Sequence, residues 1–224
     1  KTLIKMVERL DLEIGRVLSA LDKENLAGNT LVILTSDNGG AQGVSRNFPL
    51  SGAKQMLLEG GIRVPLILRW PNVLSAGKES AMPISAMDLT ATIAAAGGVS
   101  PPDDKLFDGI DMLPVLLGET QISQSRPLFF RRRNITFRQN LNSIRQSAVR
   151  QGKWKYLRNY EKNDNEKYTA TLIDLVKDIA EQNDVSEANP KRFQEMSELY
   201  ESWEAEVAKT AVPFPVVSGE MKKK

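Results

Sequence analysis

The sequence of 224 residues contains no cysteine and no histidine. The absence of cysteine excludes disulfides, thiolate zinc sites and cysteine nucleophiles. The absence of histidine removes the commonest general acid or base and the commonest transition-metal ligand. An enzyme that includes this chain must therefore use carboxylates, lysine, tyrosine, serine or a hard metal ion, or draw part of its machinery from other residues.

Long apolar runs are also missing, because no stretch approaches the roughly 20 consecutive apolar residues of a membrane-spanning helix. Hydrophobic residues make up 41% and charged residues 26%, which is typical of a globular protein with one large domain or two small ones. The first residues, Lys1-Thr-Leu-Ile-Lys-Met-Val7, lack an initiator methionine and the apolar core of a signal peptide. We therefore expect the chain to begin inside a longer protein.

The first half of the chain has the pattern of a layered α/β core. Apolar residues recur every three or four positions from Leu3 to Leu21, which predicts a helix. The uninterrupted apolar run over 30–35 predicts a strand covered on both faces, and residues 65–70 predict the next strand.

Further elements follow along the chain. We expect Asp88 to cap a helix that ends at Ala96. The remaining predicted elements are a short helix over 112–117, a strand over 127–132, a hairpin over 147–157 that turns at Gln151-Gly152, a strand over 169–175 and an amphipathic helix over 190–207. The second half therefore predicts a small antiparallel sheet with a terminal helix.

Asp37 and Asn38 follow the first predicted strand, at an end where open α/β sheets place their ligand sites. A carboxylate and an amide oxygen side by side suit Ca²⁺ or Mg²⁺ rather than softer metals. Taken alone, Asp-Asn-Gly after a strand is more often a turn. Both interpretations stay open at this point.

Lys54 lies in a glycine-bearing loop that can fold back over the same sheet edge. A lysine there can pair with a sulfate or phosphate as a point charge, or remain a solvated surface side chain. Glu59 and Arg63 flank Gly60-Gly61, and we expect them to pair across a turn and brace the loop.

Acidic residues are absent from a central block. Ten lysines or arginines and no acid lie between Arg126 and Arg158, whereas 159–206 holds thirteen acids and five bases. This block combines Arg131, Arg132 and Arg133 with the aromatic residues Phe129, Phe130, Phe137, Trp154 and Tyr156, a mixture that can bind an anionic polysaccharide or single-stranded nucleic acid. The alternative is a strand with inward aromatics and arginines that lie in solvent or pair with the acidic stretch.

Three segments, in this order, carry a resemblance to a known family: Thr35-Ser-Asp-Asn-Gly39, Asn47-Phe-Pro-Leu-Ser-Gly-Ala-Lys54 and Leu58-Glu-Gly-Gly-Ile-Arg-Val-Pro-Leu-Ile-Leu-Arg-Trp-Pro71. They resemble the second half of a type I sulfatase, of the arylsulfatase family in the alkaline phosphatase superfamily. The resemblance continues through Ser85-Ala-Met-Asp-Leu-Thr90, Asp108-Gly-Ile-Asp-Met-Leu-Pro-Val-Leu116, Pro127-Leu-Phe-Phe130, Ala148-Val-Arg-Gln-Gly-Lys-Trp-Lys-Tyr156 and Leu172-Ile-Asp-Leu175.

The resemblance implies an α/β fold class: part of an alkaline-phosphatase-like layered core, followed by a smaller antiparallel sheet and a C-terminal helix. We expect residues 1–118 to belong to the core domain, 119–212 to form the smaller α+β subdomain and 213–224 to be a loose tail.

The resemblance also implies site residues. Ca²⁺ would be held partly by Asp37 and Asn38, and Lys54 would be the catalytic, sulfate-contacting lysine. The family's nucleophile is a formylglycine made from the first residue of a Cys/Ser-x-Pro-x-Arg motif, and this sequence has no such motif. The nucleophile, further metal-binding aspartates and sulfate-binding histidines are therefore expected in a missing N-terminal half, and this chain alone should be inactive.

These observations predict the C-terminal part of a sulfuric ester hydrolase that acts on sulfated carbohydrate or an aryl sulfate. We expect Arg131, Arg132 or Arg133 to contact the anionic sugar, and no nucleic acid or membrane to be bound. Export to the periplasm or the extracellular space is implied by the family. The rivals are a phosphodiesterase or phosphonate hydrolase of the same superfamily, and a non-catalytic module that binds anionic glycan.

Overall fold

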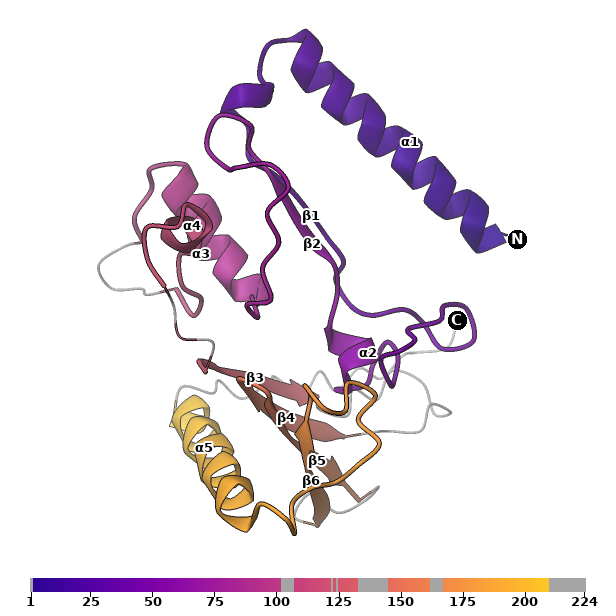
Figure 1. The fold of residues 1–224 in the computed structure, drawn as a ribbon, viewed down its shortest axis with the longest axis vertical. Helices are drawn as coiled ribbons and strands as arrows, with labels where there is room; N and C mark the ends of the chain where they lie inside the picture. The colour runs from indigo at the N-terminus through magenta and orange to yellow at the C-terminus, as the bar shows by residue number, and fades with distance from the viewer. Residues whose placement is uncertain are drawn as a thin grey trace, which may run out of the picture.

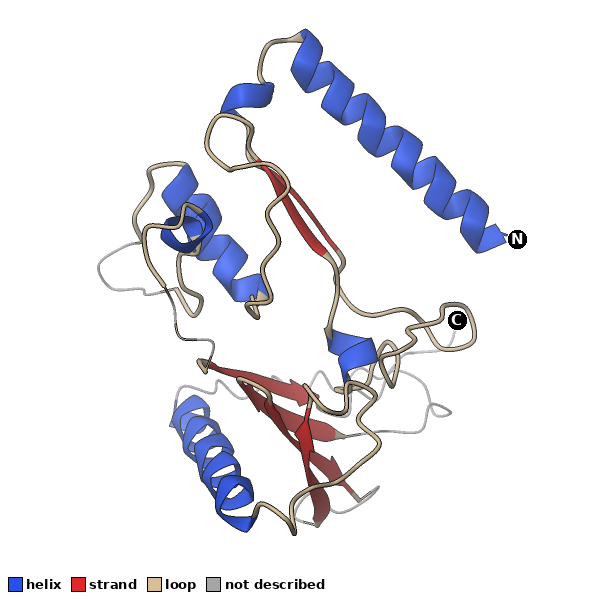
Figure 2. Cartoon of the chain, viewed as in Figure 1, coloured by secondary structure: helices blue, strands red, loops and turns tan. Residues whose placement is uncertain are grey.

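A computed structural model describes residues 2–101, 107–121, 123, 125–132, 145–161 and 167–209. Figure 1 shows a long N-terminal helix, a two-stranded ribbon, a pair of short helices and a four-stranded sheet covered by the C-terminal helix. Figure 2 shows how much of the chain between these elements is loop, notably between the two strands of the ribbon. The predicted loose tail, 213–224, lies outside the described residues.

Helix α1 (Thr2–Lys23) matches the predicted apolar periodicity. Asn25 ends it in the left-handed region (φ 57°), while the N–H of Leu26 bonds to the carbonyl of Leu21 at 2.8 Å. This is a Schellman ending, which satisfies the last free carbonyls of the helix. No residue of α1 is buried within the described chain, so its apolar stripe, including Val7 and Leu10, faces outward.

Strands β1 (Val32–Thr35) and β2 (Leu66–Arg69) form an antiparallel ribbon, in which Val32 lies opposite Arg69. The 3₁₀ turn η1 (Ala27–Asn29) connects α1 to this ribbon. We predicted that the first strand is covered on both faces, and this is wrong for the described chain. Leu34 and Ile67 are exposed, because a two-stranded ribbon has no further strands or helices here to bury its faces.

Helix α3 (Ala86–Ala96) begins with a capping box, in which Ser85 is the N-cap and Asp88 Oδ2 accepts a hydrogen bond from the N–H of Ser85. The prediction that Asp88 is the N-cap is therefore wrong, because the N-cap is Ser85, three residues earlier. Asp88 is fully buried, and the guanidinium of Arg126 donates to its Oδ1 at 3.1 Å and to its Oδ2 at 2.5 Å. This pair ties α3 to the strand that follows Arg126. The short helix α4 (Leu113–Leu116) is joined to α3 separately, because the N–H of Met112 donates to Thr92 Oγ1 at 2.9 Å.

The second sheet is antiparallel, in the order β3-β4-β5-β6. Its strands are β3 (Pro127–Arg132), β4 (Gln146–Gln151), β5 (Trp154–Tyr160) and β6 (Tyr168–Asp174). The hairpin predicted to turn at Gln151-Gly152 is confirmed, since Gln151 lies opposite Trp154. Helix α5 (Pro190–Lys209) covers one face of this sheet (Figure 1).

The face under α5 holds the larger apolar cluster, in which Val149, Tyr156 and Leu172 pack against Met196 and Tyr200. Arg158 is buried in this layer and donates to Tyr156 Oη and to Glu201 Oε1, both at 2.8 Å. Burial alone would lower the pKa of Arg158, but these bonds outweigh it and raise the pKa. A buried guanidinium therefore fastens the helix to the sheet.

The opposite face of the same sheet holds a second apolar cluster, formed by Ala148 and Leu157 with Leu57. Leu57 lies two residues before the short helix α2 (Glu59–Ile62), which the periodicity of the sequence did not predict. Side chains alternate between the faces of a strand, so the small sheet is packed on both sides. One side holds α5 and the other holds the loop that leads into α2.

Candidate functional site

The turn that carries Asp37 and Asn38 directly follows β1. Ser36 Oγ donates to the carbonyl of Asn38 at 2.9 Å, and Thr35 Oγ1 donates to the carbonyl of Pro65 at 2.9 Å. Asp37 is exposed and Asn38 is half-buried. The backbone of the turn is thus held by its neighbours, while the carboxylate of Asp37 is left accessible to a ligand.

The segment that carries Lys54 lies against this turn. The N–H of Lys54 donates to the carbonyl of Gly40 at 2.9 Å. The amide of Asn47 bonds to both Gly40 N and Gly40 O, at 3.1 and 3.2 Å, and also donates to Gly52 O at 3.0 Å. Three stretches of one loop are therefore joined, and the structure brings the Asp37-Asn38 turn next to the segment of Lys54.

Glycines allow this close approach of backbones. The N–H of Gly39 donates to Gly61 O at 2.9 Å, and a Cβ on Gly39 would lie 1.8 Å from the carbonyl oxygen of Gly60. Gly61 is equally confined, since its Cβ would meet Met56 O at 2.1 Å. Only residues without side chains fit here, so the glycine pattern is a packing requirement of the site.

A cluster of buried charges anchors the far end of this loop. Lys155 Nζ lies 3.1 Å from Glu59 Oε1 and 2.7 Å from Glu181 Oε1, and all three side chains are at most 1% exposed. Arg150 adds a contact to Glu59 at 3.4 Å. Burial raises the pKa of Glu181, although the nearby Lys155 charge works in the opposite direction.

The predicted brace between Glu59 and Arg63 is present, at 3.8 Å, but Arg63 is half-exposed. The stronger partner is Lys155, which lies 96 residues further along the chain. Local sequence offers no signal for a partner so distant. The amphipathic pattern of β5 places Lys155 on the face opposite Tyr156, and nothing in the sequence shows what covers that face.

The three arginines predicted to bind substrate have different positions. Arg131 lies on the α5 side, with its guanidinium 3.5 Å from Glu204 and 5.7 Å from the centre of the Trp203 ring. Arg132 lies on the opposite face and donates to the carbonyl of Gln55, next to Lys54. Burial lowers the pKa of Arg132, yet an arginine stays charged. Arg133 lies outside the described residues, and substrate contact by these arginines stays a prediction.

The aromatic residues of the basic block lie largely on the α5 side. Phe129 stacks on Trp203 with ring centres 4.8 Å apart, and Tyr156 meets Phe193 edge-on at 5.3 Å. These rings belong to the apolar cluster between the four-stranded sheet and α5. They are not presented as a stacking surface, which weakens the interpretation as a binder of single-stranded nucleic acid.

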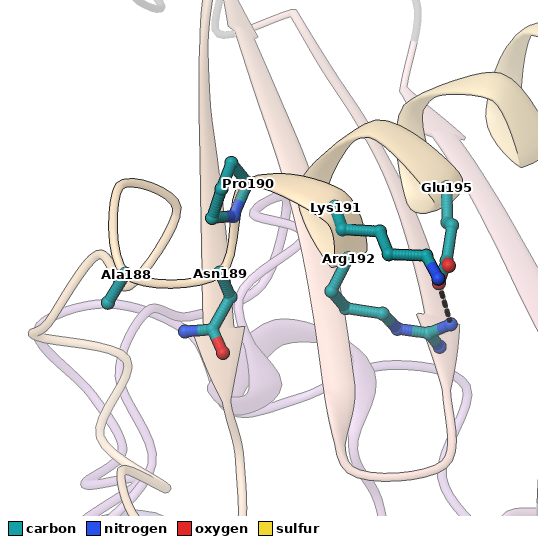
Figure 3. A pocket seen from close by; sticks show the side chains of 6 residues that line it. All are labelled: Ala188, Asn189, Pro190, Lys191, Arg192 and Glu195. Atoms are coloured by element: carbon teal, nitrogen blue, oxygen red, sulfur yellow. Dashed lines mark hydrogen bonds and ion pairs between the residues drawn. The ribbon is translucent and has the colours of Figure 1, made fainter.

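A separate open hollow of about 370 Å³ lies at the start of α5. Figure 3 shows Asn189 in the loop that enters the helix and Pro190 at the first position of the helix, with the ion pair between Arg192 and Glu195 (3.1 Å) beside them. Its lining residues come from 188–195, and none belongs to the loop of Lys54 or to the turn of Asp37. It is therefore distinct from the candidate site.

The donor atoms of the candidate site suit a hard cation. Asp37 supplies carboxylate oxygens and Asn38 an amide oxygen, whereas the chain has no thiol or imidazole. Within the part of the chain that the structure describes, no group of three or more acidic side chains is placed to hold a metal ion. Asp37 and Asn38 therefore fit one side of a Ca²⁺ site, which needs about six to eight oxygens.

Two family models match the chain. The one described as Sulfatase matches residues 2–99, and the one described as N-sulphoglucosamine sulphohydrolase, C-terminal, matches residues 52–209. Together they include the turn of Asp37, the loop of Lys54 and the small sheet with its helix.

Curated relatives agree with these models. Steryl-sulfatase of Rattus norvegicus is 43% identical over 132 residues, which cover 55% of this chain and 23% of the relative. N-acetylgalactosamine-6-sulfatase of Canis lupus familiaris is 41% identical over 132 residues, which cover 56% of this chain and 25% of the relative. This chain thus spans a minor part of these relatives' length.

Solved structures extend the similarity to the small sheet. Ps i-CgsB in complex with k-i-k-neocarrahexaose has a TM-score of 0.75 and 32% identity, covering 88% of this chain and 41% of that one. The architecture is a part of an alkaline-phosphatase-like α/β fold. The chain belongs to the sulfatase family and matches the C-terminal portion of a type I sulfatase.

Proposed function

We propose that this chain is the C-terminal part of a sulfuric ester hydrolase that acts on sulfated carbohydrate. The observation that carries the proposal is the contact between the Asp37-Asn38 turn and the Lys54 segment, joined by the bond from Lys54 N to Gly40 O. Two ligands for a hard cation and a lysine on an adjacent segment can together bind a tetrahedral anion. The sulfatase relatives support sulfate as this anion.

The residues of this chain have two roles in the proposed reaction. Asp37 and Asn38 would hold Ca²⁺, which supplies positive charge beside the sulfate oxygens when bound. Lys54 offsets the negative charge that builds on the transferred group in the transition state. The nucleophile, a formylglycine in the family, is proposed to come from residues outside this chain, so the chain alone is expected to be inactive.

The carbohydrate substrate is supported by relatives. Ps i-CgsB was solved with a neocarrahexaose, and another solved relative, 29% identical, comes from work on glycosaminoglycan metabolism in Bacteroides thetaiotaomicron. Arg131, Arg150 and Lys155 of the basic block each pair with an acidic side chain, so the carbohydrate substrate rests on the relatives and not on free positive charge. Arg131 pairs with Glu204 of α5 and Arg132 bonds to the carbonyl of Gln55, so we keep Arg133 as the candidate for sugar contact.

We also propose that the N-terminal half of the enzyme is the partner that covers the exposed apolar residues of α1, β1 and β2. Val7, Leu10 and Ile67 are each more than half exposed here. Apolar faces of this extent mark interfaces, and the solved relatives contain more than twice the matched length. No helix among the described residues is long and apolar enough to span a membrane, and export is proposed on the resemblance alone.

The proposal is tested with the complete polypeptide, assayed on p-nitrophenyl sulfate, a sulfated oligosaccharide and bis-p-nitrophenyl phosphate. A sulfatase hydrolyses the sulfate esters with the higher kcat/KM and loses this activity on chelation of Ca²⁺. A higher kcat/KM on the phosphodiester would instead support the phosphodiesterase rival. Binding of the oligosaccharide without turnover, and unchanged in the Asp37→Ala variant, would support the non-catalytic module.

A further inference from the structure

The segment from Lys54 to Glu59 lies between the candidate site and the small sheet. At one end, the N–H of Lys54 bonds to Gly40 O, beside the Asp37-Asn38 turn. At the other end, Glu59 is buried among charges of the small sheet. The position of Lys54 therefore depends on what holds this segment from the side of the sheet.

Three neighbouring strands contribute polar side chains to that segment. Arg132 on β3 donates to Gln55 O, and Gln146 Oε1 on β4 accepts from the N–H of Leu57 at 2.8 Å. Lys155 on β5 lies 3.1 Å from Glu59 Oε1. The contacts fall on residues 55, 57 and 59, so the sheet holds the segment at every second residue.

The strand register explains why these side chains act together. Arg132 lies opposite Gln146, and Lys155 lies opposite Arg150, which is on the same face of β4 as Gln146. All of them project from the face that packs on Leu57, away from α5. Arg131, one residue earlier on β3, projects to the other face and contacts Glu204.

Gln55 gives the contact of Arg132 a special importance. Its φ of 79° lies in the left-handed region, which is unfavourable for a residue other than glycine. Such a conformation persists only where surrounding contacts impose it. The guanidinium of Arg132 holds the carbonyl of this residue, directly after Lys54.

We propose that Arg132 is a positioning residue for Lys54, and that the face formed by Arg132, Gln146 and Lys155 holds the segment from Lys54 to Glu59 in place. This inference rests on the proposed function of Lys54 as the sulfate-contacting lysine. Arg132 acts through the backbone of Gln55 and not by touching the substrate. The small sheet thereby contributes to turnover without adding a group to the reacting atoms.

The experiment compares Arg132→Met, Arg132→Lys and Lys54→Ala, with the double variant, in the complete polypeptide. Arg192→Met is the matched control, because Arg192 also bonds to this sheet, through Gln151 Oε1 at 2.6 Å, but at the start of α5. Arg132→Met is expected to lower kcat on p-nitrophenyl sulfate by about 10- to 100-fold with KM nearly unchanged, since small displacements of a catalytic group cost this much.

Arg132→Lys should restore most of the turnover, because a lysine can still donate one bond to Gln55 O. Adding Arg132→Met to Lys54→Ala should lower kcat no further, which is the mark of two residues that act through one another. A purely structural role would lower the melting temperature but would leave kcat per folded enzyme unchanged. That result, or additive losses, would overturn the proposal.

Two further outcomes separate this inference from its basis. A rise in KM for the sulfated oligosaccharide with an unchanged kcat would mean that Arg132 binds substrate, and would also overturn the proposal. If Lys54→Ala itself retained full turnover, the proposed function of Lys54 would fail. Hydrogen exchange of backbone amides would then still test whether Arg132 holds the segment from Lys54 to Glu59 in place. The N–H groups of Lys54 and Leu57 should exchange faster in Arg132→Met than in Arg192→Met, and equal exchange would contradict the inference.

Discussion

The backbone N–H of Lys54 donates to the carbonyl of Gly40, two residues after Asn38, at 2.9 Å. This bond connects the two segments that carry the candidate ligands and the candidate lysine. It uses only main-chain atoms, so it is independent of the side chain at position 54. Substitution of Lys54 should therefore test its chemistry without separating the two segments.

Lys54→Ala in the complete polypeptide should lower kcat for an aryl sulfate at least tenfold, which corresponds to about 1.4 kcal/mol of lost transition-state stabilisation. The side chain is exposed, so the free energy of unfolding should change by less than about 0.5 kcal/mol. Steady-state kinetics and thermal unfolding measure the two quantities. A variant in which KM alone rises would make Lys54 a general substrate anchor.

Asp37→Ala should abolish activity and weaken Ca²⁺ binding measured by calorimetry, because a carboxylate is the stronger of the two candidate ligands in the turn. Asp37 is exposed, so the melting temperature without Ca²⁺ should stay close to that of the parent protein. Asp22→Asn, which removes an exposed carboxylate from α1, is the control. Normal turnover in Asp37→Ala would remove Asp37 from the metal site.

Gly39→Ala should damage both stability and turnover. The new Cβ would lie 1.8 Å from Gly60 O, so the turn and α2 must move apart, at a cost of about 1–3 kcal/mol. Gly15→Ala in α1 is the control, since no atom lies within 4 Å of its added Cβ and alanine favours a helix. Equal melting temperatures for Gly39→Ala and the parent protein would refute the close packing described here.

Leu10→Glu should lower the melting temperature of the complete polypeptide, because a charge would be buried where the proposed N-terminal half covers α1. We expect a loss of at least about 2 kcal/mol in the free energy of unfolding. Lys5→Glu, on the polar face of the same helix, should change this free energy by less than about 0.5 kcal/mol. Similar small effects of both substitutions would mean that the apolar face of α1 stays uncovered.

Asp174 should make stability sensitive to acid. Burial alone would raise the pKa of its carboxyl, but hydrogen bonds from Lys153 Nζ (2.7 Å) and from the N–H of Val176 outweigh this and lower the pKa. A folded-state pKa below the unfolded value adds stability that is present above the unfolded value, about pH 4, and is lost as the pH falls through the lowered value. Melting temperatures from pH 7 to pH 3 should fall less steeply in Asp174→Asn, and parallel curves would contradict the assignment.

Much of the architecture followed from local pattern. The three- and four-residue spacing of apolar side chains predicted α1 and α5, and turn residues at Gln151-Gly152 predicted the hairpin of β4 and β5. The three motif segments predicted a sulfatase, which the family models confirm. The uninterrupted apolar run predicted that β1 is covered on both faces, which is wrong for the described chain. A strand is buried only where other strands or helices pack on its faces, and a run of residues in the sequence does not show these neighbours.

The candidate site also has a part that follows from the sequence and a part that follows from the tertiary structure. The sequence by itself determined which residues can act, namely a carboxylate and an amide at Asp37 and Asn38 and a cation at Lys54, because chemistry belongs to residue type. Only the tertiary structure decided which of them meet. The contacts of Arg132 with Gln55 and of Lys155 with Glu59 join residues 77 and 96 positions apart. Strand alternation puts Arg131 and Arg132 on opposite faces, and the packing of α5 on one face and the Lys54 loop on the other gives each arginine its partner.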